Sequence, residues 1–194
     1  MLFVTFTGYG QDKDASIGIG FGGASVSSKV SDGDKASGFG FNFYLNGMYN
    51  INEKISAGLE YNSNLAVITN IDDASFDVSL TKITGILAKG RYKFGTGKNK
   101  PYAGLMAGIY LLKPGSITIN GSSIGFVFEG KTTFGFAPEV GIEIGSFQLA
   151  TSYHLPGKYS STLTDPTDGS TITIETTYSV WQFNIGWNIG FAFD

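Results

Sequence analysis

Cysteine is absent from the 194 residues, which excludes a disulfide framework and thiolate metal sites. No run of about 18 consecutive apolar residues occurs, so no transmembrane helix is expected. The net charge of −3 excludes the basic surface of a nucleic-acid-binding protein. Charge of either sign is sparse, at 15% of residues, against roughly 25% in a typical soluble domain. A soluble all-β protein needs an outer face rich in Lys, Glu and Asp, and this composition does not supply one.

Glycine and aromatic residues are abundant instead, with 28 Gly, 16 Phe and 10 Tyr. Residues 181–193 read WQFNIGWNIGFAF, so that every second position is large and apolar. The positions between them hold Gln, Asn, Gly and Ala. A period of two predicts a strand with one apolar face and one small or polar face.

Seven further segments carry strand patterns, and no amphipathic helical pattern occurs. The eight predicted strands lie at roughly 15–27, 37–51, 54–68, 78–95, 101–113, 132–144, 146–156 and 176–193. The connections alternate between long and short, and they include TNIDDASFD before the fourth strand and long loops near 114–131 and 157–176. All long loops therefore leave one end of an up-and-down array, and all tight turns leave the other.

Three details of these strands depart from a simple alternation. Ile83 and Leu87 fall on the polar face of the fourth strand, and the phase of the fifth strand is ambiguous. Pro138 has no backbone donor, which predicts a bulge or an edge-like irregularity in the sixth strand.

Two barrel architectures share the alternation. A soluble lipocalin-like barrel places its apolar face inside, whereas a transmembrane barrel places it outside. The small or polar face of the strands distinguishes the two architectures. Here it holds Gly, Ser, Asn, Ala and a few charges, whereas the water-facing exterior of a soluble barrel would be densely charged. A narrow eight-stranded lumen is expected to hold small residues, while lipid sets no limit on the size of outward side chains. The expected fold is an eight-stranded antiparallel up-and-down transmembrane β-barrel.

The bulky residues of the second and last strands are the expected lipid-facing surface. Aromatic residues near the strand ends fit an interfacial girdle of such a barrel. The residues assigned to the lipid-facing surface are Phe39, Phe41, Phe43, Trp181, Phe183, Trp187, Phe191 and Phe193.

The polar faces carry a small, balanced set of charges. A hairpin centred near residue 74 would place Glu60 close to Lys89, and a buried charge is tolerable only when it is paired. We expect such a network to fill and rigidify the lumen; a polar pathway for a small solute is the alternative. The predicted lumen network comprises Glu60, Lys89, Arg91, Lys93, Glu139, Glu143 and His154.

His154 is the only histidine, and Ser152 lies two residues before it on the same face. With Glu139 nearby, the set suggests a lipid-modifying hydrolase. However, residues two apart on a strand are separated by about 7 Å, which is poor for activating a nucleophile. No enzymatic activity, cofactor or metal site is expected.

The final segment IGWNIGFAF resembles the C-terminal signature of bacterial outer-membrane β-barrels, although Asp194 follows the closing aromatic residue. The segments PYAGLMAGIY (101–110) and APEVGIEI (137–144) resemble strands of the small outer-membrane protein A and X type barrels. This resemblance implies a Gram-negative outer membrane, termini on the periplasmic side and long loops outside the cell.

The sequence therefore predicts one barrel domain over residues 11–194, after a remnant of a secretory signal at 1–10. The first residues are also compatible with an ordinary first strand or a disordered end. The expected function is a structural or surface-recognition role through the long loops, as a monomer in contact with outer-membrane lipids. The alternatives are a small-solute channel or transporter and a soluble lipocalin-like binding barrel.

Overall fold

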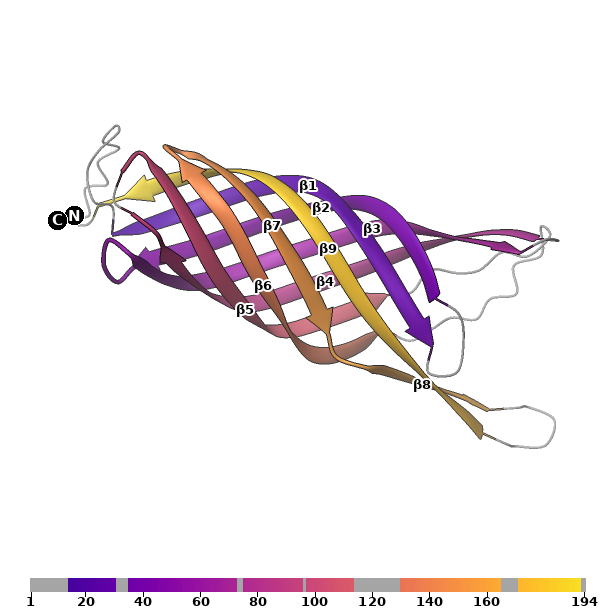
Figure 1. Ribbon diagram of the computed structural model, residues 1–194. Coiled ribbons are helices and arrows are strands. Elements are labelled where there is room, and N and C mark those ends of the chain that lie inside the picture. The colour runs from indigo at the N-terminus through magenta and orange to yellow at the C-terminus, as the bar shows by residue number, and fades with distance from the viewer. Residues whose placement is uncertain are drawn as a thin grey trace, which may run out of the picture.

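The strands pair in order around a closed barrel in the computed structural model (Figure 1), which describes residues 14–30, 35–72, 75–95, 97–113, 130–164 and 171–192. Each strand is antiparallel to its neighbours, and β9 pairs with β1 to close the sheet. The strands are β1 (Ala15–Val30), β2 (Lys35–Asn50), β3 (Ile55–Asp72), β4 (Ser75–Lys93), β5 (Asn99–Lys113), β6 (Lys131–Ile144), β7 (Phe147–Pro156), β8 (Tyr159–Thr164) and β9 (Thr171–Phe191).

The segments β7 and β8 both pair with β9 and act as one interrupted strand. Within the described residues the barrel therefore has the eight antiparallel strands that the sequence predicts, and that prediction is confirmed. In the part of the chain that the structure describes, no helix is long and apolar enough to cross a membrane.

The tight turns, the start of β1 and the end of β9 all lie at the same end of the barrel (Figure 1). There the Asn50 amide donates to the Asp14 carbonyl over 2.8 Å, and the Asn188 amide donates to the Ser146 carbonyl over 2.7 Å. Gly145 adopts a positive φ of 62° in the turn between β6 and β7, a conformation that favours glycine. We call this the turn end, and the opposite end the hairpin end.

Two hairpins extend beyond the rest of the wall at the hairpin end (Figure 1). The β3–β4 ladder continues to Asp72 and Ser75, although β2 leaves β3 at Ile68. Similarly, β8 and β9 pair out to residues 164 and 171. The segments TNIDDASFD and 157–176 were predicted as loops, which was wrong, because the β3–β4 and β8–β9 ladders continue through most of them beyond the barrel wall. The loop predicted at 114–131 lies outside the described residues except for its last two.

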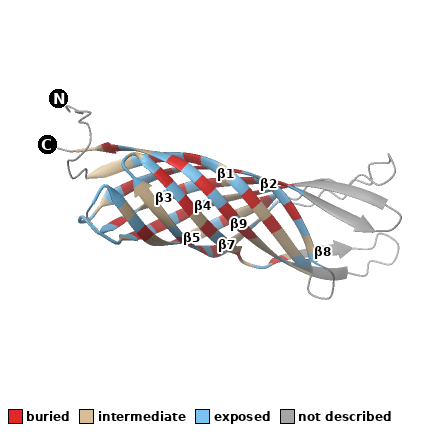
Figure 2. Ribbon diagram, turned by 45° about the horizontal axis from the view of Figure 1, so that its top comes forward, coloured by how far each residue is buried: buried red, intermediate tan, exposed pale blue. Residues whose placement is uncertain are grey.

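Exposed and buried residues alternate along much of the wall (Figure 2), and most of the bulky apolar residues are exposed on the outside. Phe39 and Phe41 are 78% and 79% exposed, and Trp181 is 47% exposed. This arrangement excludes the lipocalin-like alternative, in which these side chains would form the core. Phe43, Phe183 and Trp187 are also exposed, Phe191 is half-buried, and Phe193 lies outside the described residues.

The lumen was expected to hold small residues, but three large tyrosines also point inward. Tyr44, Tyr102 and Tyr110 are almost completely buried. Glycines opposite them make the room: a Cβ on Gly20 or Gly186 would collide with the Tyr44 ring or its hydroxyl. The large inward side chains thus occupy space that is open because the facing glycines have no side chain.

An apolar cluster closes the lumen toward the hairpin end. Ile83 and Leu87, the residues that broke the alternation of the fourth strand, are both fully buried in it. The phase of β5 is also settled, since Tyr102, Met106 and Tyr110 face inward. The cluster comprises Ala24, Val26, Ala66, Ile83, Leu87, Met106, Tyr110, Leu112, Ala137, Tyr159 and Val180.

Pro138 interrupts a ladder without causing a bulge. Phe136 pairs with Leu155 and Glu139 pairs with Ser152, so equal numbers of residues separate the two pairs on each strand. The pairing is lost only between them, where the proline has no N–H to donate.

Candidate functional site

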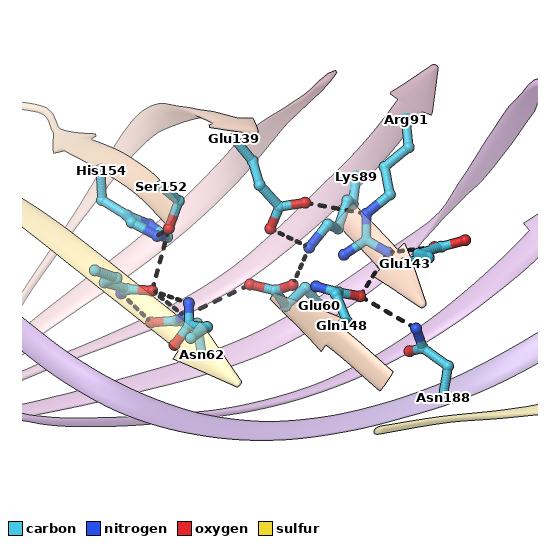
Figure 3. A network of polar contacts seen from close by, with 12 residues as sticks. Glu60, Asn62, Lys89, Arg91, Glu139, Glu143, Gln148, Ser152, His154 and Asn188 are labelled. Atoms are coloured by element: carbon cyan, nitrogen blue, oxygen red, sulfur yellow. Dashed lines mark hydrogen bonds and ion pairs between the residues drawn. The ribbon is translucent and has the colours of Figure 1, made fainter. Parts of the chain in front are cut away.

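The lumen contains a network of ion pairs centred on Lys89 (Figure 3). Its Nζ lies 2.5 Å from Glu60 Oε2 and 2.8 Å from Glu139 Oε2. These three side chains are only 1–3% exposed. Antiparallel register places Gly58 opposite Lys89, so Glu60 lies diagonally across the β3–β4 ladder on the same face.

Arg91 extends the network toward the turn end (Figure 3). Its Nε donates to Glu139 over 3.0 Å, and its Nη1 donates to Gln148 Oε1 over 2.9 Å and to Glu143 over 3.3 Å. The guanidinium also lies 4.4 Å from the centre of the Tyr102 ring, a cation–π contact.

Lys93 completes the set at the turn end, 3.3 Å from Glu143 Oε2. The network therefore contains three cations, Lys89, Arg91 and Lys93, and three carboxylates, Glu60, Glu139 and Glu143. Each buried charge faces an opposite charge, which offsets the cost of removing it from water. This matched cluster spans the lumen from β3 and β4 to β6.

A second network of amides lies beside the ion pairs. Asn62 Nδ2 donates to Gln182 Oε1 over 3.2 Å, and Gln182 Nε2 donates to Asn64 Oδ1 over 2.7 Å. These contacts join β3 to β9 across the lumen. Sequence reasoning missed these three residues, although Asn62 and Asn64 sit at consecutive inward positions of a strand pattern.

His154 belongs to this polar region and not to the ion pairs. Its Nδ1 lies 2.9 Å from the Tyr110 hydroxyl, and its Nε2 lies 3.0 Å from Ser152 Oγ. The estimate that Ser152 and His154 are too far apart was therefore wrong: both side chains lean toward each other into the lumen (Figure 3). Glu139 is opposite Ser152 in the ladder, but its carboxylate binds Lys89 and Arg91 instead.

The Ser152–His154 pair is sealed from solvent. The two residues are 3% and 0% exposed. The residue that orients the histidine is Tyr110, where a hydrolytic triad carries a carboxylate. Ser152, His154 and Tyr110 thus form a buried hydrogen-bond chain in the lumen.

Several inward polar atoms have no hydrogen-bond partner among the described residues. Those on β2 belong to Asn42, Tyr44 and Asn46. An unpaired buried polar group costs about 1–3 kcal/mol. Part of the polar lumen is therefore unsatisfied among the described residues. The remaining unpartnered atoms are Arg91 Nη2, Tyr102 Oη, Gln148 Nε2, Tyr159 Oη and Asn184 Oδ1.

Comparison with protein-family models and with curated proteins gives no match. Solved structures share the fold. Ail, the attachment invasion locus protein of Yersinia pestis, aligns with a TM-score of 0.51 at 15% identity, over 90% of this chain and 99% of Ail. The outer membrane protein AlkL, solved in DMPC bilayers, aligns with a TM-score of 0.54 at 14% identity, over 95% of this chain and 94% of AlkL.

A second structure of Ail, in complex with the heparin analogue sucrose octasulfate, aligns with a TM-score of 0.50 at 16% identity, over 90% of this chain and 99% of Ail. At these identities the similarity establishes the fold. The chain has the architecture of the small outer-membrane β-barrels, as the resemblance in its strand motifs implied.

Proposed function

We propose that this chain is a monomeric, non-enzymatic protein of a Gram-negative outer membrane, which recognises a partner at the cell surface through its two protruding hairpins. The termini lie on the periplasmic side, since short turns face the periplasm and longer connections face outward in barrels of this kind.

The outer face supports the membrane placement. Exposed apolar residues cover the wall from Tyr92 near the turn end to Phe39 and Phe134 near the hairpin end. In hydrocarbon every backbone polar group must be paired, which a closed barrel achieves. The closure of β9 on β1 meets this requirement.

The filled lumen supports a role other than conduction. A continuous path would have to pass the ion pairs at Lys89 and Arg91 and then the apolar cluster around Ile83 and Val180. These residues are at most 4% exposed. An eight-stranded barrel has just enough interior for side chains, and here they fill it.

The unpaired edges of the hairpins carry the proposal of surface recognition. Among the described residues, positions 75–81 of β4 pair with β3 alone, because the described pairing with β5 begins at Lys82. The residues of β8 likewise pair with β9 alone within the part of the chain that the structure describes. Free strand edges present unpaired N–H and C=O groups, which bind an extended polypeptide by adding it as a further strand.

Truncating the hairpins tests this role. Tyr159 and Thr176 are directly paired, as are Ile68 and Ser79, so an Asn-Gly turn can join each pair and remove the extensions without altering the wall. The probe is reduced, carboxymethylated lactalbumin, an extended polypeptide, and the assay is its co-sedimentation with vesicles carrying the barrel.

We expect the full chain to bind this probe and the truncated chain to lose most of the binding, with folded lactalbumin as the control. Equal binding by both chains would contradict hairpin recognition. Planar-bilayer recording addresses the rival function: discrete, sustained channels from the full chain would favour a small-solute pore, whereas the filled lumen predicts silence.

A further inference from the structure

Four exposed lysines at the hairpin end form two like-charged pairs. Lys29 of β1 is directly opposite Lys35 of β2, and Lys82 of β4 is directly opposite Lys113 of β5. Like charges opposite each other on neighbouring strands are destabilising. Among the described residues, no carboxylate lies within ion-pairing distance of any of the four. Within the described residues, the repulsion in these two lysine pairs is therefore not relieved by a carboxylate, and an external anion would relieve it.

These lysines lie on the outside of the wall. Lys82 shares a face of β4 with Ile86, and Lys113 shares a face of β5 with Ile109; both isoleucines are strongly exposed. Opposite residues on one face of a ladder have Cβ atoms about 5 Å apart. Each pair can therefore hold one phosphate group between two ammonium groups.

The height of the pairs on the barrel matches the edge of a bilayer. From Tyr92 to Lys82, β4 advances ten residues, which is about 33 Å along the strand and about 25 Å along the barrel axis at a tilt of about 40°. The apolar band of outer-membrane barrels is about 25 Å tall. From Ile17 to Lys29 the same arithmetic gives about 30 Å. The Lys29–Lys35 pair thus stands just beyond the apolar surface. The Lys82–Lys113 pair lies at its margin, with the exposed Val67 one outward position farther along the neighbouring strand.

We propose that Lys29 with Lys35, and Lys82 with Lys113, bind phosphate groups of lipid headgroups in the leaflet at the hairpin end. Hydrogen bonds between ammonium and phosphate groups are charge-assisted, which makes them stronger than hydrogen bonds between neutral groups. The inference rests on the proposed membrane placement and does not require the hairpins to bind a partner. A soluble polyanion is the competing ligand, but Lys82 and Lys113 share their outward faces with the exposed apolar Ile86 and Ile109.

The test uses the full chain and counts bound lipid by native mass spectrometry after release from detergent micelles. The probes are dimyristoyl phosphatidic acid, which carries an exposed phosphate, and dimyristoyl phosphatidylcholine, which is zwitterionic. We expect phosphatidic acid to bind more tightly, and each Lys→Gln substitution within a pair to weaken it roughly fivefold. The double variants K29Q/K35Q and K82Q/K113Q remove one site each.

Lys158 supplies the matched control. It is exposed at the hairpin end but already pairs with Glu175, 3.2 Å away. K158Q should change phosphatidic acid binding less than about twofold, because its charge is partly neutralised. Retarded migration of unheated samples on a detergent gel verifies that each variant is folded.

A quadruple variant that binds phosphatidic acid as well as the parent chain would overturn the proposal, and so would an equal loss in K158Q. Heparin binding at these lysines without any preference for phosphatidic acid would also overturn it, in favour of a soluble polyanion. A chain that stays in the aqueous phase without entering vesicles would instead refute the membrane placement.

Discussion

Replacing Lys89 by methionine tests the energetic role of the lumen network. Lys89 contacts Glu60 and Glu139 and is 1% exposed. In its absence, Glu139 keeps Arg91 as a cationic partner, whereas Glu60 keeps, among the described residues, only the Asn62 amide at 3.5 Å. The balance of three cations and three carboxylates then becomes two against three.

Breaking a buried ion pair by removing one partner costs about 3–5 kcal/mol. We expect K89M to lower the free energy of unfolding by that amount. E60Q combined with K89M restores the charge balance and replaces the orphaned carboxylate by an amide. The double variant should therefore recover about 2 kcal/mol relative to K89M, because no uncompensated charge remains buried.

The assay is urea unfolding of the barrel in lipid vesicles, followed by the fluorescence of Trp181 and Trp187 on the outer face of β9. Lys54→Met, at an exposed position in the tight turn between β2 and β3, serves as the control. A K89M variant within about 1 kcal/mol of the parent, or a double variant no more stable than K89M, would refute the reasoning.

Three other variants have distinct expected outcomes. Gly20→Ala should cost about 1–3 kcal/mol because its Cβ would strike the Tyr44 ring, whereas Gly23→Ala, with no atom within 4 Å, should leave the unfolding curve nearly unchanged. Tyr159→Phe should raise the free energy of unfolding by about 1 kcal/mol, since its buried hydroxyl has no partner among the described residues; a loss of stability would contradict this. Ser152→Ala should destabilise the barrel by about 1–3 kcal/mol, because the contacts of the hydroxyl with the His154 ring and the Gln182 side-chain amide are lost. Membrane lipid composition, measured in cells with and without the variant, should not change.

The order of the strands could be predicted from the sequence because it follows from local alternation along the chain. The Glu60–Lys89 contact could be predicted because it depends on a single hairpin. A hairpin centred near residue 74 brings these two side chains to one face, whatever the rest of the barrel does. The contact of Lys89 with Glu139 was not accessible in this way. It crosses the lumen from β4 to β6, so it depends on how the closed sheet curves and on the reach of both side chains.

The inward tyrosines show a second limit of strand patterns. Alternation places Tyr44 on the inner face but cannot tell that Gly20 and Gly186, from two other strands, leave space for its ring. Likewise, ideal strand spacing separates Ser152 from His154 by about 7 Å, whereas their side-chain atoms meet at 3.0 Å in the lumen. Side-chain conformation inside a curved wall decides both cases, and backbone periodicity carries no information about it.

The orientation of the wall is tested most directly by the two tryptophans, Trp181 and Trp187, which are the only ones in the chain. Both are exposed on the outer face of β9. In vesicles made with brominated acyl chains, we expect strong quenching of their fluorescence, and little quenching by acrylamide added to the water. Strong quenching by acrylamide, with no effect of the brominated chains, would contradict a barrel whose bulky side chains face lipid.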